Sequence, residues 1–231
     1  MIGAEGVERL AQAYVVVLGL GGVGSHCALA LARAGVGRLL LVDHDVVQES
    51  NINRQALAFH STLGCKKVDV AARMIADINP ACRVDVRDCF VLPENLVSLF
   101  CADDGTPLPR PDYIVDCIDT VASKLAVALY AQERGLRLVS SMGAGNKFDP
   151  LQFRFDDIYD TSVCPLCKVM RKEARARGIE HLEVLYSVEK PVDVASAQGA
   201  ARSERSNLGT LSYMPEAMGV LLASRVIRAL L

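Results

Sequence analysis

The stretch that decides the fold is Tyr14-Val-Val-Val-Leu-Gly-Leu-Gly-Gly-Val-Gly-Ser25. Its first five residues are apolar and rich in β-branched side chains, which predicts a buried strand over Tyr14–Leu18. The glycines that follow, Gly19, Gly21, Gly22 and Gly24, allow a tight turn in which backbone N–H groups come close to a phosphate. A helix opening at Gly22 adds unpaired N–H groups and the positive end of its dipole. Strand, turn and helix together predict a nucleotide-binding unit.

Outward from this unit, short apolar runs alternate with segments of helical periodicity. Such alternation is typical of βαβ units and of a parallel sheet. Strands are predicted at Tyr14–Leu18, Arg38–Val42, Arg83–Arg87, Tyr113–Ile118 and Leu136–Ser140, and helices at Gly22–Ala34, Lys66–Asn79, Pro93–Phe100 and Val121–Arg134. The predicted fold class is α/β, with a doubly wound, Rossmann-like, mainly parallel sheet. Its ligand site is expected beyond the carboxyl ends of the strands.

The character of the sequence changes after Ser141. We predict a half-exposed strand at Gln152–Asp156, a basic helix at Cys164–Arg177, a strand at Glu183–Tyr186, a loop at Ser187–Asn207 and an amphipathic helix at Met214–Leu231. The predicted division is a nucleotide-binding half, residues 1–140, and a smaller, partly antiparallel half, residues 141–231, that faces the substrate within one compact domain. Whether the last helix packs at a dimer interface or touches a membrane surface stays open.

Composition narrows the class of protein. The 231 residues carry a net charge of −2, which excludes a broadly basic nucleic-acid coat but leaves room for a local basic patch. Several of the eight cysteines lie in apolar runs and no secretion signal precedes them, so we expect reduced thiols in a cytoplasmic protein. The uncharged run at residues 10–32 is broken by glycines, so we expect no membrane span there.

Polar residues beyond the predicted strand ends favour ATP over NAD. Asp43 ends the strand that follows the glycine turn, where a carboxylate typically binds ribose hydroxyls. Arg54 and Lys67 then suit an enzyme of triphosphates, because cations offset the repulsion when a carboxylate attacks an α-phosphate. A dehydrogenase has little use for them. Asp119, just past the fourth strand, is the candidate for magnesium, and capping of the next helix is its alternative role.

Taken together, these motifs resemble the ubiquitin-activating-type adenylyltransferases, the ThiF/MoeB/HesA family, over most of residues 15–150. The resemblance is carried by the glycine turn, Asp43, Asn53-Arg54-Gln55, Lys67, Ile78-Asn79-Pro80 and Asp116-Cys-Ile-Asp119. It implies that Arg54, Lys67 and Asp119 are catalytic and that Asp119 holds magnesium with ATP. Lys67 is preferred to Lys66 because its spacing from Arg54 matches the family. The predicted nucleotide site comprises Gly19, Gly21, Gly22, Gly24, Asp43, Ser50, Asn51, Asn53, Arg54 and Lys67.

The second half resembles the tRNA threonylcarbamoyladenosine dehydratases within that family. The matching motifs are Ser140-Ser-Met-Gly-Ala-Gly-Asn-Lys-Phe-Asp149-Pro150, Asp160-Thr-Ser-Val-Cys-Pro-Leu, Val169-Met-Arg-Lys and Gly209-Thr-Leu-Ser-Tyr-Met-Pro. This resemblance implies ATP-dependent activation of the threonylcarbamoyladenosine carboxylate in tRNA, cyclisation with net loss of water, and a homodimer. The substrate carboxylate is expected near Gly143–Asn146. A sulfur-transfer protein is a further candidate partner.

Two features favour RNA over a carrier protein as the substrate. Four cations, Lys168, Arg171, Lys172 and Arg175, share one face of a predicted helix and could follow a phosphate backbone, with Arg177, Arg202 and Arg205 nearby. A merely solvated charged face is the alternative. The pair Cys164-Pro-Leu-Cys167 is followed by no second cysteine pair, so no structural zinc is expected. Whether this pair is redox-active, nucleophilic or incidental stays open.

Three other functions are compatible with the sequence. They are activation of the C-terminus of a ubiquitin-like sulfur carrier of the thiamine or molybdopterin type, a nucleotide-binding pseudoenzyme and, least favoured, an NAD dehydrogenase. The chain starts at Met1-Ile-Gly-Ala-Glu-Gly6, without the segment that in relatives carries an arginine to the partner subunit's ATP, and Arg9 does not match that position. We therefore expect either a start upstream of Met1 or weaker adenylation.

Overall fold

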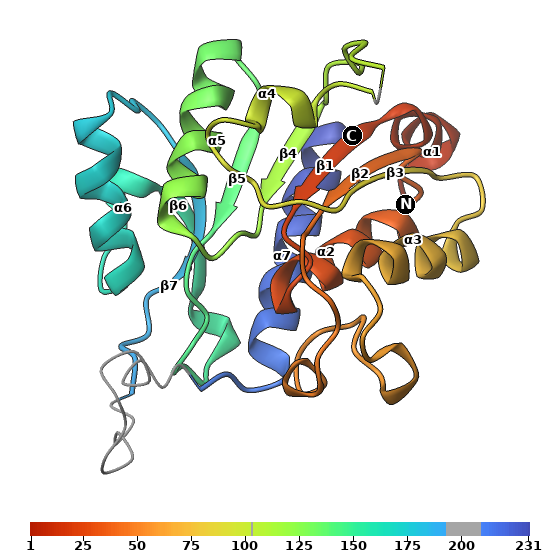
Figure 1. The fold of residues 1–231 in the computed structure, drawn as a ribbon. Coiled ribbons are helices and arrows are strands. Elements are labelled where there is room, and N and C mark those ends of the chain that lie inside the picture. The colour runs from red at the N-terminus through yellow and green to blue at the C-terminus, as the bar shows by residue number, and fades with distance from the viewer. Residues whose placement is uncertain (103, 193–208) are drawn as a thin grey trace.

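The computed structural model describes residues 1–102, 104–192 and 209–231, which form a three-layer α/β fold around one seven-stranded sheet (Figure 1). The strand order is β3-β2-β1-β4-β5-β7-β6, and neighbouring strands run parallel except for the antiparallel pair β6 and β7. The strands are β1 Tyr14–Leu18, β2 Arg38–Val42, β3 Arg83–Arg87, β4 Tyr113–Asp116, β5 Leu138–Ser141, β6 Phe153–Asp157 and β7 Glu183–Ser187. The predicted doubly wound, mainly parallel sheet is confirmed.

Helices cover both faces of the sheet. They are α1 Gly3–Gln12, α2 Gly22–Arg33, α3 Lys67–Ile78, α4 Leu96–Leu99, α5 Val121–Arg134, α6 Pro165–Ala176 and α7 Tyr213–Leu230. Side chains of α2, α3 and α7 pack with Val15 and Val17 of β1 on one face, and those of α4 and α5 pack with Val16 on the other. Because β1 is buried on both faces, it needs an unbroken apolar run rather than an alternating one.

The register of the central strands brings their carboxyl ends to one edge. Leu18 lies opposite Val42 of β2 and Asp116 of β4, so the segments that follow these three strands meet there. The chain termini lie side by side at the other end, where Arg9 of α1 donates a hydrogen bond to the carbonyl of Leu231 (Figure 1). In the described parts of the chain, no helix is long and apolar enough to cross a membrane.

Several predicted boundaries were wrong, each for a local reason. The strand predicted at Tyr113–Ile118 ends at Asp116, whose carboxylate accepts the N–H of Ile118 and turns the chain. The strand predicted at Leu136–Ser140 is observed as β5, Leu138–Ser141. It begins later than predicted because the N–H of Leu136 still donates to the carbonyl of Ala131 and closes α5. The helix predicted at Pro93–Phe100 is observed only as the short helix α4, Leu96–Leu99. It starts late because the Asn95 side chain accepts the N–H of Leu92 and donates to the carbonyl of Phe90.

Four predicted elements agree fully with the observed ones: Tyr14–Leu18, Arg38–Val42, Arg83–Arg87 and Val121–Arg134. The remaining predicted elements differ from the observed ones by one residue at one or both ends. Helix α1 was not predicted, although Gly6 and Leu10, four residues apart, both face the core. Of the loop predicted at Ser187–Asn207, residues 193–207 lie outside the described part of the chain, as do Arg202 and Arg205. The division between residues 140 and 141 stays a prediction, and one sheet runs across it.

Candidate active site

A cavity of about 940 Å³ opens at the carboxyl edge of the sheet. One wall, which we call the nucleotide wall, consists of the β1–α2 turn, the residues after β2, and Asn51, Arg54, Gln55 and Lys67. The opposite wall, which we call the loop wall, consists of residues 141–147 after β5 and Cys164–Leu166 at the start of α6. Residues 117–120, Ser123 and Lys124 lie between the two walls and also line the cavity.

The glycine turn is fixed by backbone packing as well as by its position at the cavity. Gly19 has a φ of 86°, and a Cβ there would lie 2.9 Å from the carbonyl oxygen of Cys117. A Cβ on Gly24 would lie 1.8 Å from the carbonyl oxygen of Gly19. Gly24 does not line the cavity, whereas Gly19, Gly21 and Gly22 do. Gly24 therefore lets α2 start close to the turn, and its place in the nucleotide site stays a prediction.

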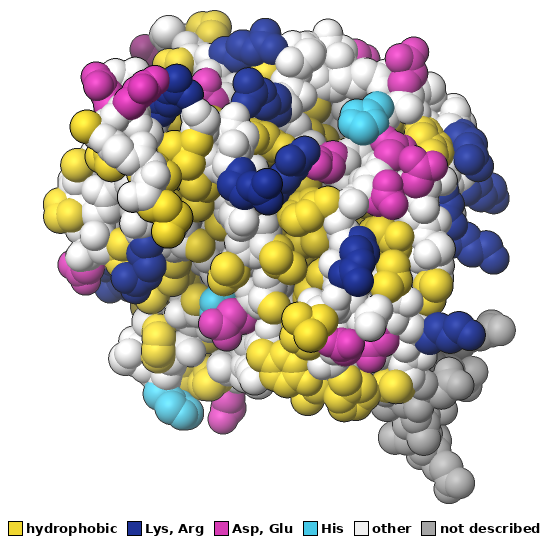
Figure 2. Space-filling model, turned by 180° about the vertical axis from the view of Figure 1, so that it is seen from behind, with side chains coloured by type: hydrophobic (Ala, Val, Ile, Leu, Met, Phe, Trp, Pro, Cys, Tyr) yellow, Lys and Arg dark blue, Asp and Glu magenta, His cyan; other side chains and the backbone are white. Residues whose placement is uncertain are grey.

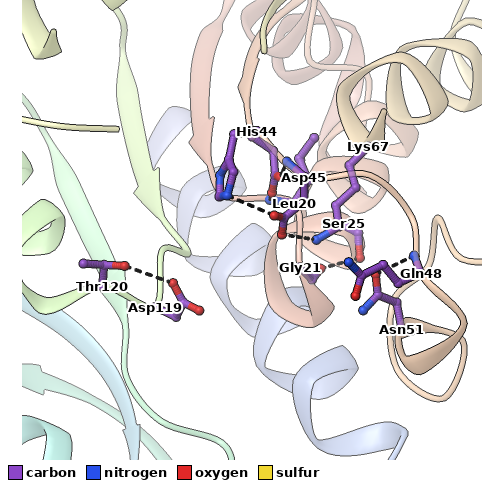
Figure 3. Close-up of polar contacts among 11 residues, drawn as sticks. Leu20, Gly21, Ser25, His44, Asp45, Gln48, Asn51, Lys67, Asp119 and Thr120 are labelled. Atoms are coloured by element: carbon purple, nitrogen blue, oxygen red, sulfur yellow. Dashed lines mark hydrogen bonds and ion pairs between the residues drawn. The ribbon is translucent and has the colours of Figure 1, made fainter. Parts of the chain in front are cut away.

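Asp43 organises the turn from the end of β2. Its carboxylate accepts the N–H of Leu20 at 2.6 Å and the N–H of Asp45 at 2.8 Å, and it lines the cavity. Asp45 in turn pairs with Lys67, with 2.7 Å between its Oδ2 and the Lys67 Nζ, and with His44 (Figure 3). Asp43, His44 and Asp45 have ligand atoms within 4.8 Å of one another, the one such group of three in the described residues.

The two predicted cations reach the nucleotide wall by different routes. Lys67 is 3% exposed, while Lys66 points away from the cavity and pairs with Asp88, which supports the choice of Lys67. Arg54 Nη1 donates to the carbonyl of Ser50 and to Asn53 Oδ1, both at 2.8 Å. Ser50 and Asn53 do not line the cavity themselves but hold Arg54, and their contact with the nucleotide stays a prediction.

Two further predicted residues, Asn51 and Asp119, also line the cavity. Asn51 lines the cavity and is buried, and its Oδ1 accepts the N–H of Gln48 at 3.0 Å (Figure 3). Asp119 is exposed at the cavity, and its Oδ1 accepts a hydrogen bond from Thr120 at 3.3 Å. The cap of α5 is Thr120 rather than Asp119, so the alternative role of Asp119 as the helix cap was wrong. The catalytic and metal-binding roles themselves stay predictions.

Sequence reasoning missed a buried network between the walls. Lys124 of α5 is 1% exposed, and its Nζ lies 3.0 Å from Asp116 Oδ2, 3.2 Å from Ser140 Oγ and 2.7 Å from the Ser141 carbonyl oxygen. It thereby ties together β4, β5 and α5 directly beneath the cavity. No local pattern marks this lysine, because its partners are 8 to 17 residues away in other elements.

The loop wall holds a lysine and a cysteine that were not predicted as site residues. Lys147 and Cys164 both line the cavity and both are 3% exposed. Burial lowers the pKa of Lys147, and hydrogen bonds from Cys167 lower the pKa of Cys164 well below its usual value. Cys117, which lines the same cavity, behaves in the opposite way, since burial raises its pKa to about 12. All eight cysteines are free, as predicted.

The basic face predicted on α6 is only partly available to a ligand. Arg171 donates to the carbonyl and to Oγ1 of Thr161, and the guanidinium of Arg175 lies 5.0 Å from the centre of the Tyr159 ring. Lys168 and Lys172 are exposed, and no ion pair is found for them within the described residues. The structure therefore assigns two of the four cations to packing within the protein.

Comparison with known proteins identifies relatives along the whole chain. A sequence model of the ThiF family matches residues 1–231. A tRNA threonylcarbamoyladenosine dehydratase of Bacillus subtilis is 39% identical over 239 residues, covering 100% of this chain and 91% of that protein. The structure of the E. coli tRNA N6-threonylcarbamoyladenosine dehydratase in complex with ATP superposes with a TM-score of 0.85 at 30% identity, covering 99% of this chain and 89% of that one.

A carrier-activating relative matches a shorter part. The adenylyltransferase and sulfurtransferase UBA4 of Eremothecium gossypii is 32% identical over 155 residues, covering 67% of this chain and 33% of that protein.

Proposed function

The chain belongs to the ThiF family, and from this premise we propose that it is an ATP-dependent tRNA threonylcarbamoyladenosine dehydratase. One observation carries the proposal. Similarity to the Bacillus subtilis dehydratase runs through the entire chain, whereas similarity to the carrier-activating UBA4 covers 67% of it. The loop wall and α6, which belong to residues 141–231, are thus part of what this chain shares with a dehydratase.

The reaction begins with attack of a carboxylate oxygen on the α-phosphorus of ATP. A bond forms between these two atoms, the bond to the bridging oxygen breaks, and pyrophosphate leaves. Both reactants are anions, so positive charge must offset their repulsion and stabilise the leaving group. Lys67 and Arg54 supply that charge from the nucleotide wall, Arg54 by a guanidinium that suits phosphate oxygens. Gly21, Gly22 and Asp43 line the same cavity, and we assign the glycines to the phosphates and Asp43 to the ribose.

The activated carboxyl group then undergoes ring closure. The carbon of the acyl adenylate is attacked by a nucleophilic atom of the same threonylcarbamoyl side chain, AMP leaves, and one proton is released. Summed over both steps, the side chain loses one water, whose elements pass to ATP as it becomes AMP and pyrophosphate. Exclusion of bulk water from the site would favour this outcome because it protects the adenylate from hydrolysis.

Asp119 is the residue we assign to magnesium. Only one of its carboxylate oxygens accepts a hydrogen bond within the described residues, and the group is exposed at the cavity. A carboxylate completed by phosphate oxygens and water suits this ion. When bound, magnesium would neutralise charge on the phosphates.

We assign tRNA binding first to Lys168 and Lys172, the exposed cations of α6. Arg171 and Arg175 contribute less, since their guanidinium groups already have partners in the fold. A sulfur-transfer partner stays a prediction.

A homodimer is part of the proposal. Figure 2 shows hydrophobic side chains at the surface on the back of the molecule. The exposed large hydrophobic residues include Leu151 in the turn before β6 and Tyr213 and Val220 of α7. A second copy of this chain is the partner that the family resemblance implies. Light scattering of the purified protein would give twice the monomer mass, and a mass of 24.9 kDa would refute the dimer.

Mass spectrometry of nucleosides tests the activity. The protein is incubated with ATP, magnesium and tRNA that carries threonylcarbamoyladenosine, and the modified nucleoside should lose one water mass only when ATP is present. Lys67→Ala, Arg54→Ala and Asp119→Ala should abolish the change. Lys66→Ala is the matched control, because this neighbouring lysine does not line the cavity and should leave activity intact. An unchanged nucleoside with the intact protein would refute the dehydratase assignment.

The match to UBA4 makes carrier activation the second candidate. Exchange of labelled pyrophosphate into ATP that depends on a ubiquitin-like protein with a Gly-Gly end, and not on tRNA, would support it. Absence of exchange with either substrate would support a pseudoenzyme.

A further inference from the structure

Three lysines are buried in the described residues, and all three line the cavity. Lys67 pairs with Asp45, with 2.7 Å between Nζ and Oδ2. Lys124 pairs with Asp116, with 3.0 Å between Nζ and Oδ2. Lys147, on the loop wall, makes no ion pair with a carboxylate within the described residues. The proposed mechanism gives this third lysine no role.

The ammonium group of Lys147 has only two hydrogen-bond partners, and both are uncharged. Its Nζ donates to the carbonyl oxygens of Gly143 at 3.2 Å and of Ser187 at 3.4 Å. An ammonium group has three N–H donors. One donor of Lys147 is therefore without a partner in the described part of the chain.

Burial makes the positive charge of Lys147 costly. The residue is 3% exposed, and burial lowers its pKa because water no longer solvates the ammonium. Glu189 acts on this charge from nearby without contacting it, because its carboxylate oxygens accept the N–H groups of the two residues that follow Lys147. An anion bound in the cavity would give the ammonium the direct partner that it lacks among the described residues.

The backbone next to Lys147 is held from two sides. Asn146 has a φ of 57°, a left-handed conformation that asparagine tolerates better than most residues. Its N–H donates to the carbonyl oxygen of Gly209 at 2.8 Å, and its carbonyl oxygen accepts the N–H of Val192 at 2.9 Å. The lysine therefore extends from a fixed backbone, which lowers the cost of ordering it around a ligand.

The position of Lys147 favours a carboxylate over a phosphate as that anion. Arg54 and Lys67, the cations that we assign to the ATP phosphates, lie on the nucleotide wall. The exposed lysines of α6, Lys168 and Lys172, are open to an RNA backbone, whereas Lys147 is nearly enclosed. A group that reaches it must project from its carrier, as the threonylcarbamoyl carboxylate projects from its base.

We propose that the Lys147 ammonium binds the carboxylate of threonylcarbamoyladenosine and thereby selects modified tRNA. This inference rests on the proposed function, which makes that carboxylate the reacting group. One carboxylate oxygen accepts a hydrogen bond from Lys147, and the other stays free to attack the α-phosphorus of ATP. Unmodified adenosine is rejected because it would leave the buried charge without an anion.

Binding of three anticodon stem-loops in the absence of ATP tests this role. The first carries threonylcarbamoyladenosine, the second carries its methyl ester, which has nearly the same shape but no charge, and the third carries adenosine. The intact protein should bind the acid about tenfold more tightly than the other two, as for one charge-assisted hydrogen bond. Fluorescence anisotropy of the labelled RNAs gives the three Kd values.

Two variants remove the charge in different ways. Lys147→Met removes the charge and the hydrogen bonds, whereas Lys147→Gln keeps an N–H donor for the Gly143 carbonyl. Both should bind all three RNAs within about twofold of the Kd that the intact protein has for unmodified RNA. Their Kd for ATP should stay unchanged. Lys66→Met, at an exposed lysine that does not line the cavity, is the matched control and should keep the preference for the acid.

Every outcome supports or overturns the role of Lys147. If the intact protein binds the ester as tightly as the acid, the role is wrong, whether or not the variants fold. A folded Lys147→Gln that still prefers the acid also overturns it. Equal loss of affinity for all three RNAs would assign Lys147 to a backbone phosphate instead, and weaker ATP binding would assign it to the nucleotide. Because these measurements need no turnover, an intact protein that fails to dehydrate its substrate would refute the proposed function and leave the binding result to decide the role of Lys147.

Discussion

The nucleotide wall and the loop wall of the cavity place a buried lysine by two different means. On the nucleotide wall, Lys67 pairs with the carboxylate of Asp45, with 2.7 Å between its Nζ and Oδ2. On the loop wall, Lys147 donates to the carbonyl oxygens of Gly143 and Ser187, and burial lowers its pKa. A carboxylate beside a buried lysine favours its charged form, whereas neutral carbonyl oxygens offset the cost of burial less. The two walls therefore hold their lysines in different electrostatic surroundings.

The largest effect is expected where the two walls are joined. Asp116→Asn leaves the buried Lys124 ammonium without its counter-charge and should lower the free energy of unfolding by about 3–5 kcal/mol. Urea unfolding measures this loss. The double variant Asp116→Asn with Lys124→Met should be less destabilised than the sum of the single variants. A loss below about 1 kcal/mol in the single variant would mean that this network does not hold the walls together.

The turn of the nucleotide wall should be sensitive at one glycine and tolerant at its neighbour. Gly24→Ala forces a Cβ into the carbonyl oxygen of Gly19 and should cost about 3 kcal/mol of stability. Gly21→Ala meets nothing closer than 4.0 Å and should unfold at a temperature near that of the intact protein. Thermal unfolding of both variants compares them directly. Equal melting temperatures would show that packing does not select Gly24.

Removing one lysine from each wall separates their roles. Lys67→Met should lower ATP–pyrophosphate exchange about 100-fold, because it removes charge stabilisation from the leaving pyrophosphate. Lys147→Met should leave the KM for ATP near its normal value. It should instead raise the KM for tRNA or lower kcat. Steady-state kinetics with each substrate varied in turn measures both. Identical kinetic patterns in the two variants would remove the distinction between the walls.

The smallest effects are expected outside the cavity, on α6. Lys168→Ala and Lys172→Ala should each weaken tRNA binding about threefold and reduce the dependence of log Kd on log salt by about one, as for loss of one phosphate contact. Arg83→Ala, an exposed cation at the opposite edge of the sheet, is the control. Filter binding over a range of salt concentrations gives both quantities. Unchanged salt dependence in the lysine variants would exclude α6 from the tRNA surface.

The nucleotide wall was largely predictable because it is built from local patterns. A glycine turn between a β-branched run and a helix, a carboxylate at the end of the next strand and a lysine at the start of the next helix lie in consecutive βα units. The structure adds contacts that spacing alone does not distinguish from contact with a ligand. Ser50 and Asn53 bind Arg54, and Gly24 makes room for a backbone oxygen.

The loop wall could not be predicted to the same depth. Cys164 was recognised as half of a cysteine pair whose role stayed open, and Lys147 was only part of a motif. Their meeting at one cavity depends on the fold bringing the start of α6 to the loop after β5. The burial of Lys147 has no signature in sequence.

The sequence by itself determined the order of strands and helices, the glycine turn and the family to which the chain belongs, because periodicity and turn chemistry act between residues close in the chain. Only the tertiary structure decided which charges meet. Asp116 and Lys124, for example, are brought together by strand register and helix packing. Each needs the other, since the cost of a buried charge depends on the neighbours that surround it.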